Sequence, residues 1–132
     1  MTGIRRIRKP ESKPDPLEHS IQVKVIDAID VGKTHPDIYA FAIPNAGRRS
    51  FRTGIKMKAE GLRRGVADIC IMLPEAKTGW LEMKRIKGKK STTQSTDQLG
   101  FAARCKRLGH PYAVASTLDE AIVALRQMGV LR

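Results

Sequence analysis

Apolar residues recur at helical spacing in the segment that follows residue 15. One stripe is formed by Leu17, Ile21, Val25 and Ile29. Such a stripe is typical of an amphipathic helix. Asp15 suits the N-cap, Pro16 suits the first helical position, and Gly32 ends the pattern. We therefore predict a helix that begins at Pro16 and ends at about Gly32.

Short apolar runs between polar or Gly- and Pro-containing segments predict the strands. They cover residues 38–43, 68–73, 80–84 and 112–115. The second and third runs are close in sequence and are expected to form a hairpin, with a turn at Thr78-Gly79. The connection 45–64 is basic and contains several glycines, and we expect one helical turn or more in it, near Lys56–Glu60.

Two further helices are predicted from their N-terminal residues. Ser95 with Gln98, and Thr117 with Glu120, have the spacing of capping boxes. Apolar residues follow each pair at helical spacing, up to Gly109 in the first case and about Met128 in the second. The predicted fold is therefore α/β, with an αβββαβ core in which helices flank a mixed central sheet.

Length and composition limit the chain to one domain. It has 132 residues, of which 41% are hydrophobic, enough for a buried core. We expect this domain to span 15–132, after a flexible basic arm at 1–14. No apolar run reaches the ~20 residues that a membrane-spanning helix needs, and no apolar stretch follows the basic N-terminus. The two cysteines have no partners at zinc spacing, so we expect a reduced, intracellular protein.

The chain carries a large positive charge. Its 25 Lys and Arg exceed its 13 Asp and Glu, and the formal net charge is +12. The basic residues gather near the N-terminus, between 48 and 64, and between 84 and 90. Solvated surface is the simplest interpretation of such groups. The favoured interpretation is that these groups contact a nucleic acid, because Lys and Arg release counterions from phosphate backbones.

Two acidic residues and a lysine are expected to share one face of the predicted hairpin. Residues two apart in a strand point to the same side, so Glu82 and Lys84 project together, opposite Leu81 and Met83. Asp68 opens the preceding strand on the same side. Such a set suits metal-assisted hydrolysis of a phosphodiester, in which carboxylates hold Mg²⁺ and an ammonium orients water. The alternative is a salt bridge between Lys84 and either acid.

At these residues the chain resembles the PD-(D/E)xK nucleases, and more closely the VRR-NUC family of virus-type replication–repair nucleases. The likeness rests on five pieces in order: Glu18 with Gln22, Pro44-Asn45-Ala46-Gly47, Leu62-Arg63-Arg64-Gly65 leading to Asp68, Leu81-Glu82-Met83-Lys84, and Ser95-Thr96-Asp97-Gln98. Ala67 departs from the proline that is usual before the aspartate. The resemblance implies a restriction-endonuclease-like core.

The resemblance also implies a role for each matching residue. Asp68 and Glu82 would bind Mg²⁺ or Mn²⁺ together with the main-chain carbonyl of Met83, and Glu18 would join them directly or through water. Lys84 would serve the nucleophilic water, and Gln98 would position Lys84 or the phosphate. Glu18 and Gln98 also fit helix capping alone, and the two roles can coexist.

The function expected from the resemblance is metal-dependent cleavage of branched DNA, first of all four-way (Holliday) junctions, by a homodimer in DNA repair. Flap or nicking activity, an archaeal-type junction resolvase and a non-catalytic DNA-binding module are alternatives. The resemblance also suggests a bacterial cytoplasm or a phage-infected cell, near the nucleoid. The expected DNA contacts are Arg48, Arg49, Arg52, Lys56, Arg63, Arg64, Lys87, Lys89 and Lys90.

Overall fold

A computed structural model describes residues 16–44, 51–84, 86–87, 90–91 and 94–132. The predicted arm at 1–14 lies outside these residues. The helices are α1 (Pro16–Gly32), α2 (Phe51–Ala59), α3 (Thr96–Leu108) and α4 (Leu118–Gln127). The strands are β1 (Tyr39–Ala42), β2 (Ile69–Leu73), β3 (Lys77–Met83), β4 (Ile86–Lys87), β5 (Lys90–Ser91) and β6 (Tyr112–Ala115). The predicted order of helices and strands is confirmed.

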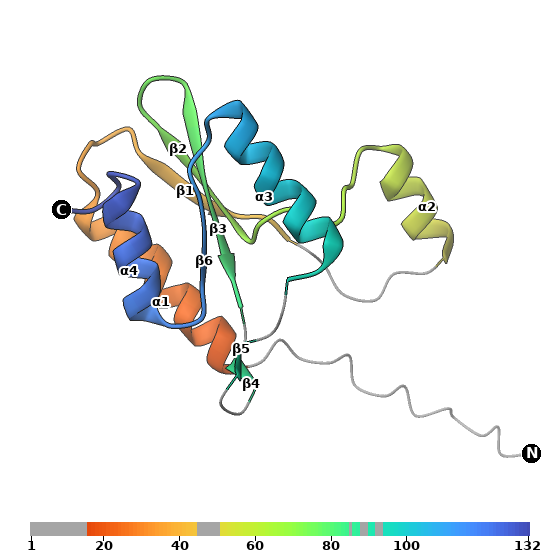
Figure 1. The fold of residues 1–132 in the computed structure, drawn as a ribbon, viewed down its shortest axis with the longest axis horizontal. Coiled ribbons are helices and arrows are strands. Elements are labelled where there is room, and N and C mark those ends of the chain that lie inside the picture. The colour runs from red at the N-terminus through yellow and green to blue at the C-terminus, as the bar shows by residue number, and fades with distance from the viewer. Residues whose placement is uncertain (1–15, 45–50, 85, 88–89, 92–93) are drawn as a thin grey trace, which may run out of the picture.

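The central sheet is mixed, as predicted. Its strand order is β1-β2-β3-β6, in which β1, β2 and β3 are antiparallel neighbours and β6 pairs in parallel with β3. Figure 1 shows α1 and α4 on one side of the sheet and α3 on the other, while α2 lies beyond α3 and away from the sheet. The sheet therefore lies between two helical layers.

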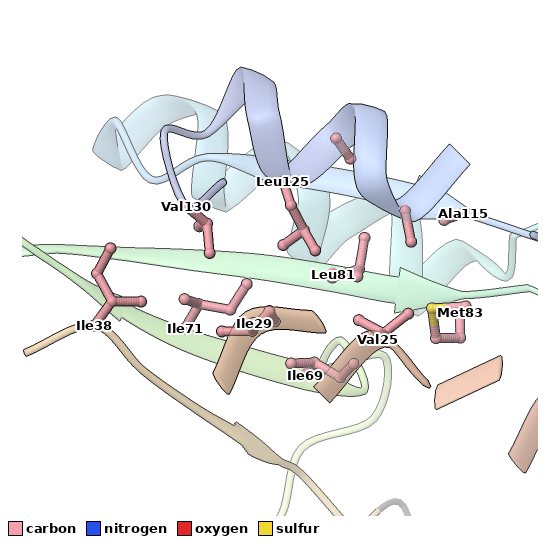
Figure 2. Close-up of a cluster of buried hydrophobic side chains, with 12 residues drawn as sticks. Val25, Ile29, Ile38, Ile69, Ile71, Leu81, Met83, Ala115, Leu125 and Val130 are labelled. Atoms are coloured by element: carbon pink, nitrogen blue, oxygen red, sulfur yellow. The ribbon is translucent and has the colours of Figure 1, made fainter. Parts of the chain in front are cut away.

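The main hydrophobic core lies between the sheet and the layer formed by α1 and α4 (Figure 2). Ile69 and Ile71 of β2 and Leu81 of β3 are fully buried there. They pack in one cluster with apolar side chains of α1 and α4. These are Val25 and Ile29 of α1 and Ala121, Ala124 and Leu125 of α4. Because every second strand residue enters this core, the residues between them face α3.

The structure differs from the sequence prediction at the β2–β3 turn. Thr78 and Gly79 lie inside β3, and the turn is made by residues 74–76, with positive φ angles at Glu75 and Ala76. Gly79 is buried, and a Cβ there would lie 3.2 Å from Met128 Sδ and 3.3 Å from Leu73 Cδ1. Close packing, and not a turn, explains a glycine at position 79.

The helix predicted near Lys56–Glu60, of one turn or more, is α2, which begins earlier, at Phe51. The polar loop after Lys84 holds more structure than expected, because it contains the short hairpin of β4 and β5. The capping box predicted at Thr117 is incomplete: Thr117 Oγ1 accepts from the Glu120 N–H, but the Glu120 carboxylate accepts from the Ser116 N–H. Within the described residues, no helix is long and apolar enough to cross a membrane.

Candidate active site

The strand register places Asp68 and Glu82 on the face of the sheet that α3 covers. Cys70 pairs with Trp80, and Ile69 pairs with Leu81, so Asp68 and Glu82 follow the alternation opposite the main core. Asp68 directly precedes β2, and Glu82 lies near the end of β3, so both lie at the same edge of the sheet. This is the arrangement that the alternation in the sequence predicts.

Asp68 is fixed by both neighbouring strands. Its side-chain Oδ2 accepts a hydrogen bond of 2.8 Å from the Met83 N–H, and its main-chain oxygen accepts one of 2.7 Å from the Ile43 N–H. The first bond ties the carboxylate to the end of β3. Asp68 therefore lies beside the Glu82-Met83-Lys84 segment.

Gln98 joins Glu82 to Lys84. Its Nε2 donates to Glu82 Oε1 at 2.9 Å, and its Oε1 accepts from Lys84 Nζ at 2.5 Å. Glu82 is only 3% exposed, and the main-chain N–H of Lys84 donates to the Ala115 carbonyl, which extends the pairing of β3 with β6. One amide thus links a buried carboxylate to an ammonium.

The same glutamine also caps α3. The Ser95 N–H donates to Gln98 Oε1 at 2.9 Å, and the Gln98 N–H donates to Ser95 Oγ at 3.2 Å, which completes a capping box. Capping and bridging, which the sequence analysis allowed to coexist, occur together. The cap holds the first turn of α3, from which the amide reaches β3.

A small aromatic cluster lies between the sheet and α3. Phe101 of α3 meets Trp80 edge to face at 5.1 Å and Tyr112 at 6.1 Å. Gln94 Nε2 donates to the Tyr112 hydroxyl at 2.8 Å. Burial, and after it the charge of Glu82, raises the pKa of Tyr112 to about 12. Sequence analysis missed this neighbour of Glu82, because Tyr112 reaches it only through the parallel pairing of β6.

The two cysteines are buried on the same side of the sheet. Cys70 lies in β2 and Cys105 is the one buried residue of α3. Burial raises the pKa of both thiols, and the nearness of Cys105 raises that of Cys70 further. Both effects favour the unreactive thiol over the thiolate. Neither cysteine is suited to act as a nucleophile here.

The expected DNA contacts are described only in part. Arg52 and Lys56 are exposed on α2, and Arg63 and Arg64 are exposed on the segment between α2 and Asp68. Arg63 Nη1 donates to the main-chain oxygens of Lys58 and Leu62, each at 3.3 Å. Arg48, Arg49 and Lys89, and the side chains of Lys87, Lys90 and Glu18, lie outside what the structure describes.

The donor atoms suit a hard divalent cation. Asp68 and Glu82 supply carboxylate oxygens, and Mg²⁺ is commonly held by one or two carboxylates while it keeps several waters. Among the residues that the structure describes, no group of three or more His, Cys, Asp or Glu is placed to hold a metal ion. A third ligand, from the Met83 carbonyl or from Glu18, stays a prediction.

Known structures share this fold. One, described as "VRR_NUC domain protein", superposes with a TM-score of 0.68 at 20% identity and covers 91% of this chain and 99% of its own. Another, "VRR_NUC domain", gives a TM-score of 0.57 at 16% identity over 83% of this chain and 95% of its own. No protein-family model and no curated protein matches the sequence. The chain therefore has the fold of VRR_NUC domains, and the resemblance found in the sequence is confirmed for the fold.

Proposed function

We propose that the protein is a Mg²⁺- or Mn²⁺-dependent endonuclease that hydrolyses phosphodiester bonds in DNA. The observation that carries this proposal is the chain of contacts from Glu82 through Gln98 to Lys84, at the strand end that Asp68 also reaches. A carboxylate at 3% exposure is costly to bury unless its charge is paired, hydrogen-bonded or bound to a metal ion, and a bound cation would offset that cost. The VRR_NUC fold supports the same conclusion.

Each residue has a distinct part in this proposal. Asp68 and Glu82 would hold the cation, with the Met83 carbonyl and Glu18 as further ligands. The cation, when bound, would polarise the phosphate and lower the pKa of a water. Lys84 would orient that water and stabilise negative charge that develops on the phosphate. Gln98 keeps the Lys84 ammonium at a fixed place relative to Glu82.

The DNA would lie along the basic segment that leads into the site. Arg52 and Lys56 are exposed on α2, and Arg63 and Arg64 are exposed on the chain that runs from α2 to Asp68. Because α2 lies away from the sheet (Figure 1), its exposed basic side chains would be able to contact phosphates, although Lys56 also lies 3.9 Å from the Glu60 carboxylate. We propose branched DNA, with four-way junctions first, as the substrate. Two symmetric cuts in a junction require two sites, which a homodimer would supply.

The electrostatic part of the proposal predicts a salt dependence. Each neutralised phosphate contributes about −0.9 to the slope of log K against log salt concentration. The change of Arg52 and Arg64 together to Ala should make this slope shallower by about 1 for each residue. Lys77→Ala is the matched control, because Lys77 is exposed at the opposite end of β3. A slope near zero in the unchanged protein would contradict the proposal.

Cleavage assays on labelled DNA test the activity. Four-way junction, flap and linear duplex should each be incubated with Mg²⁺, Mn²⁺ or EDTA, with Glu82→Ala, Lys84→Ala and the control Lys77→Ala. We expect metal-dependent cutting of the junction that both site variants lose and the control retains. Cutting of the flap or duplex alone would keep the mechanism and change the substrate. Tight binding without cleavage in any metal would leave a DNA-binding module and refute the enzyme.

A further inference from the structure

Gly65 lies in unusually close contact with the first turn of α3. A Cβ at this position would lie 2.3 Å from the carbonyl carbon of Asp97, 2.5 Å from its oxygen and 2.7 Å from the nitrogen of Gln98. All three neighbours are backbone atoms, so no side-chain rotation can relieve the contact. The φ angle of Gly65 is 83°, in the region that favours glycine. Glycine is thus required here for space as well as for conformation.

This contact joins the two segments that supply the site. Gly65 precedes Asp68 by three residues, and the peptide that it touches leads directly into Gln98. Further along α3, Phe101 packs in the aromatic cluster and Cys105 is buried. At the first turn, the contact with Gly65 acts together with the Gln98 bonds to Glu82 and Lys84.

We propose that Gly65 is a positioning residue, which sets the distance between the Asp68 segment and Gln98. Gln98 in turn holds the Glu82 carboxylate and the Lys84 ammonium at a fixed place relative to each other. Its effect on catalysis rests on the proposed nuclease function. Any side chain would force the Gly65 segment and the first turn of α3 about 1 Å further apart, because the closest contact of 2.3 Å must lengthen to the 3.4 Å of ordinary contact. On this proposal, the movement lengthens and weakens the Gln98 bonds of 2.5 and 2.9 Å.

The chain contains a matched control for the test. Gly129, just after α4, also has a positive φ, 80°, but a Cβ there would meet nothing within 4 Å. Gly129→Ala and Gly65→Ala therefore introduce comparable backbone strain, and only the second introduces a collision. Comparison of the two variants therefore separates the effect of the collision from the effect of backbone strain.

Cleavage kinetics provide the first measurement. In Gly65→Ala we expect kcat to fall about 100-fold, because an error of about 1 Å in a catalytic group costs that much, while KM changes little. Gly129→Ala should keep both constants, because Gly129 lies outside the site and outside the basic segment. Gly65→Ala combined with Gln98→Ala should be no slower than the slower single variant, because both act through one amide. Additive losses in the double variant would overturn the positioning role.

Trp80 provides a measurement that does not depend on activity. It is the single tryptophan and lies edge to face against Phe101 of α3, so its emission reports how α3 sits on the sheet. We expect the emission of Gly65→Ala to differ from that of the wild type and the emission of Gly129→Ala to match it. Identical emission in all three proteins would overturn the inference. A wild type that cuts no DNA but shows the expected emission differences would refute the nuclease proposal alone. A Gly65→Ala protein that cannot fold, beside a folded Gly129→Ala, would overturn the inference as well.

Discussion

Replacement of Gln98 by Ala tests the centre of the proposed site. The change removes the Nε2 donor to the buried Glu82 carboxylate and the Oε1 acceptor for both Lys84 and the Ser95 N–H. Loss of a donor to a buried polar group costs about 1–3 kcal/mol of stability. Loss of a residue that orients ligands lowers metal affinity or activity about 10–100-fold. We therefore expect both the unfolding free energy and cleavage to fall.

Ser95→Ala is the control that separates capping from bridging. It removes the hydroxyl that accepts from the Gln98 N–H but keeps the Ser95 N–H that holds the Gln98 side chain. Such a change at an N-cap costs about 1 kcal/mol. We expect Ser95→Ala to lose that stability while it keeps most of its cleavage activity, so that the two variants differ mainly in rate.

Urea unfolding and cleavage of the preferred DNA should be measured on the same preparations of these variants. If Ser95→Ala lost as much activity as Gln98→Ala, the amide would act only through the helix cap. If Gln98→Ala cut DNA at the wild-type rate, the bridge from Glu82 to Lys84 would have no part in catalysis. Either result would refute the reasoning from this geometry.

Two further predictions concern ionisable groups beside the site. Because folding raises the pKa of Tyr112 to about 12, its phenol ionises first in the unfolded chain, and stability should fall as pH rises from about 10 to 12. Ultraviolet titration of Tyr39→Phe, in which Tyr112 is the remaining tyrosine, should give a midpoint near the raised value; a midpoint near 10 would contradict this. Burial raises the pKa of Cys70 and Cys105, so a thiol reagent at pH 8 should label both slowly in the folded protein and rapidly in denaturant. Equal rates in the two states would show that the thiols are accessible.

Several parts of this protein follow from its sequence because their causes are local. The stripe of α1 and the capping box at Ser95 depend on residues within a few positions of each other. The capping box is confirmed, and so is the part of the stripe formed by Ile21, Val25 and Ile29. The alternation in 68–73 and 80–84 likewise predicts which residues enter the core, because neighbouring strand residues point to opposite faces. That alternation is sufficient to place Asp68 and Glu82 on one side of the sheet.

Other parts depend on contacts between distant segments. The local sequence predicts a turn at Gly79, but this residue lies inside β3, where it packs closely against Leu73 and Met128. The parallel pairing of β6 brings Tyr112 near Glu82, and α3 carries Gln98 across to β3. No periodicity encodes such contacts, since they form only when the sheet and helices pack together. Local sequence is thus sufficient for the strand faces and for the cap at Ser95. The way in which Gly65 and Gln98 bring Asp68, Glu82 and Lys84 together is set by the tertiary structure, because the distances between these residues depend on packing between helices and strands.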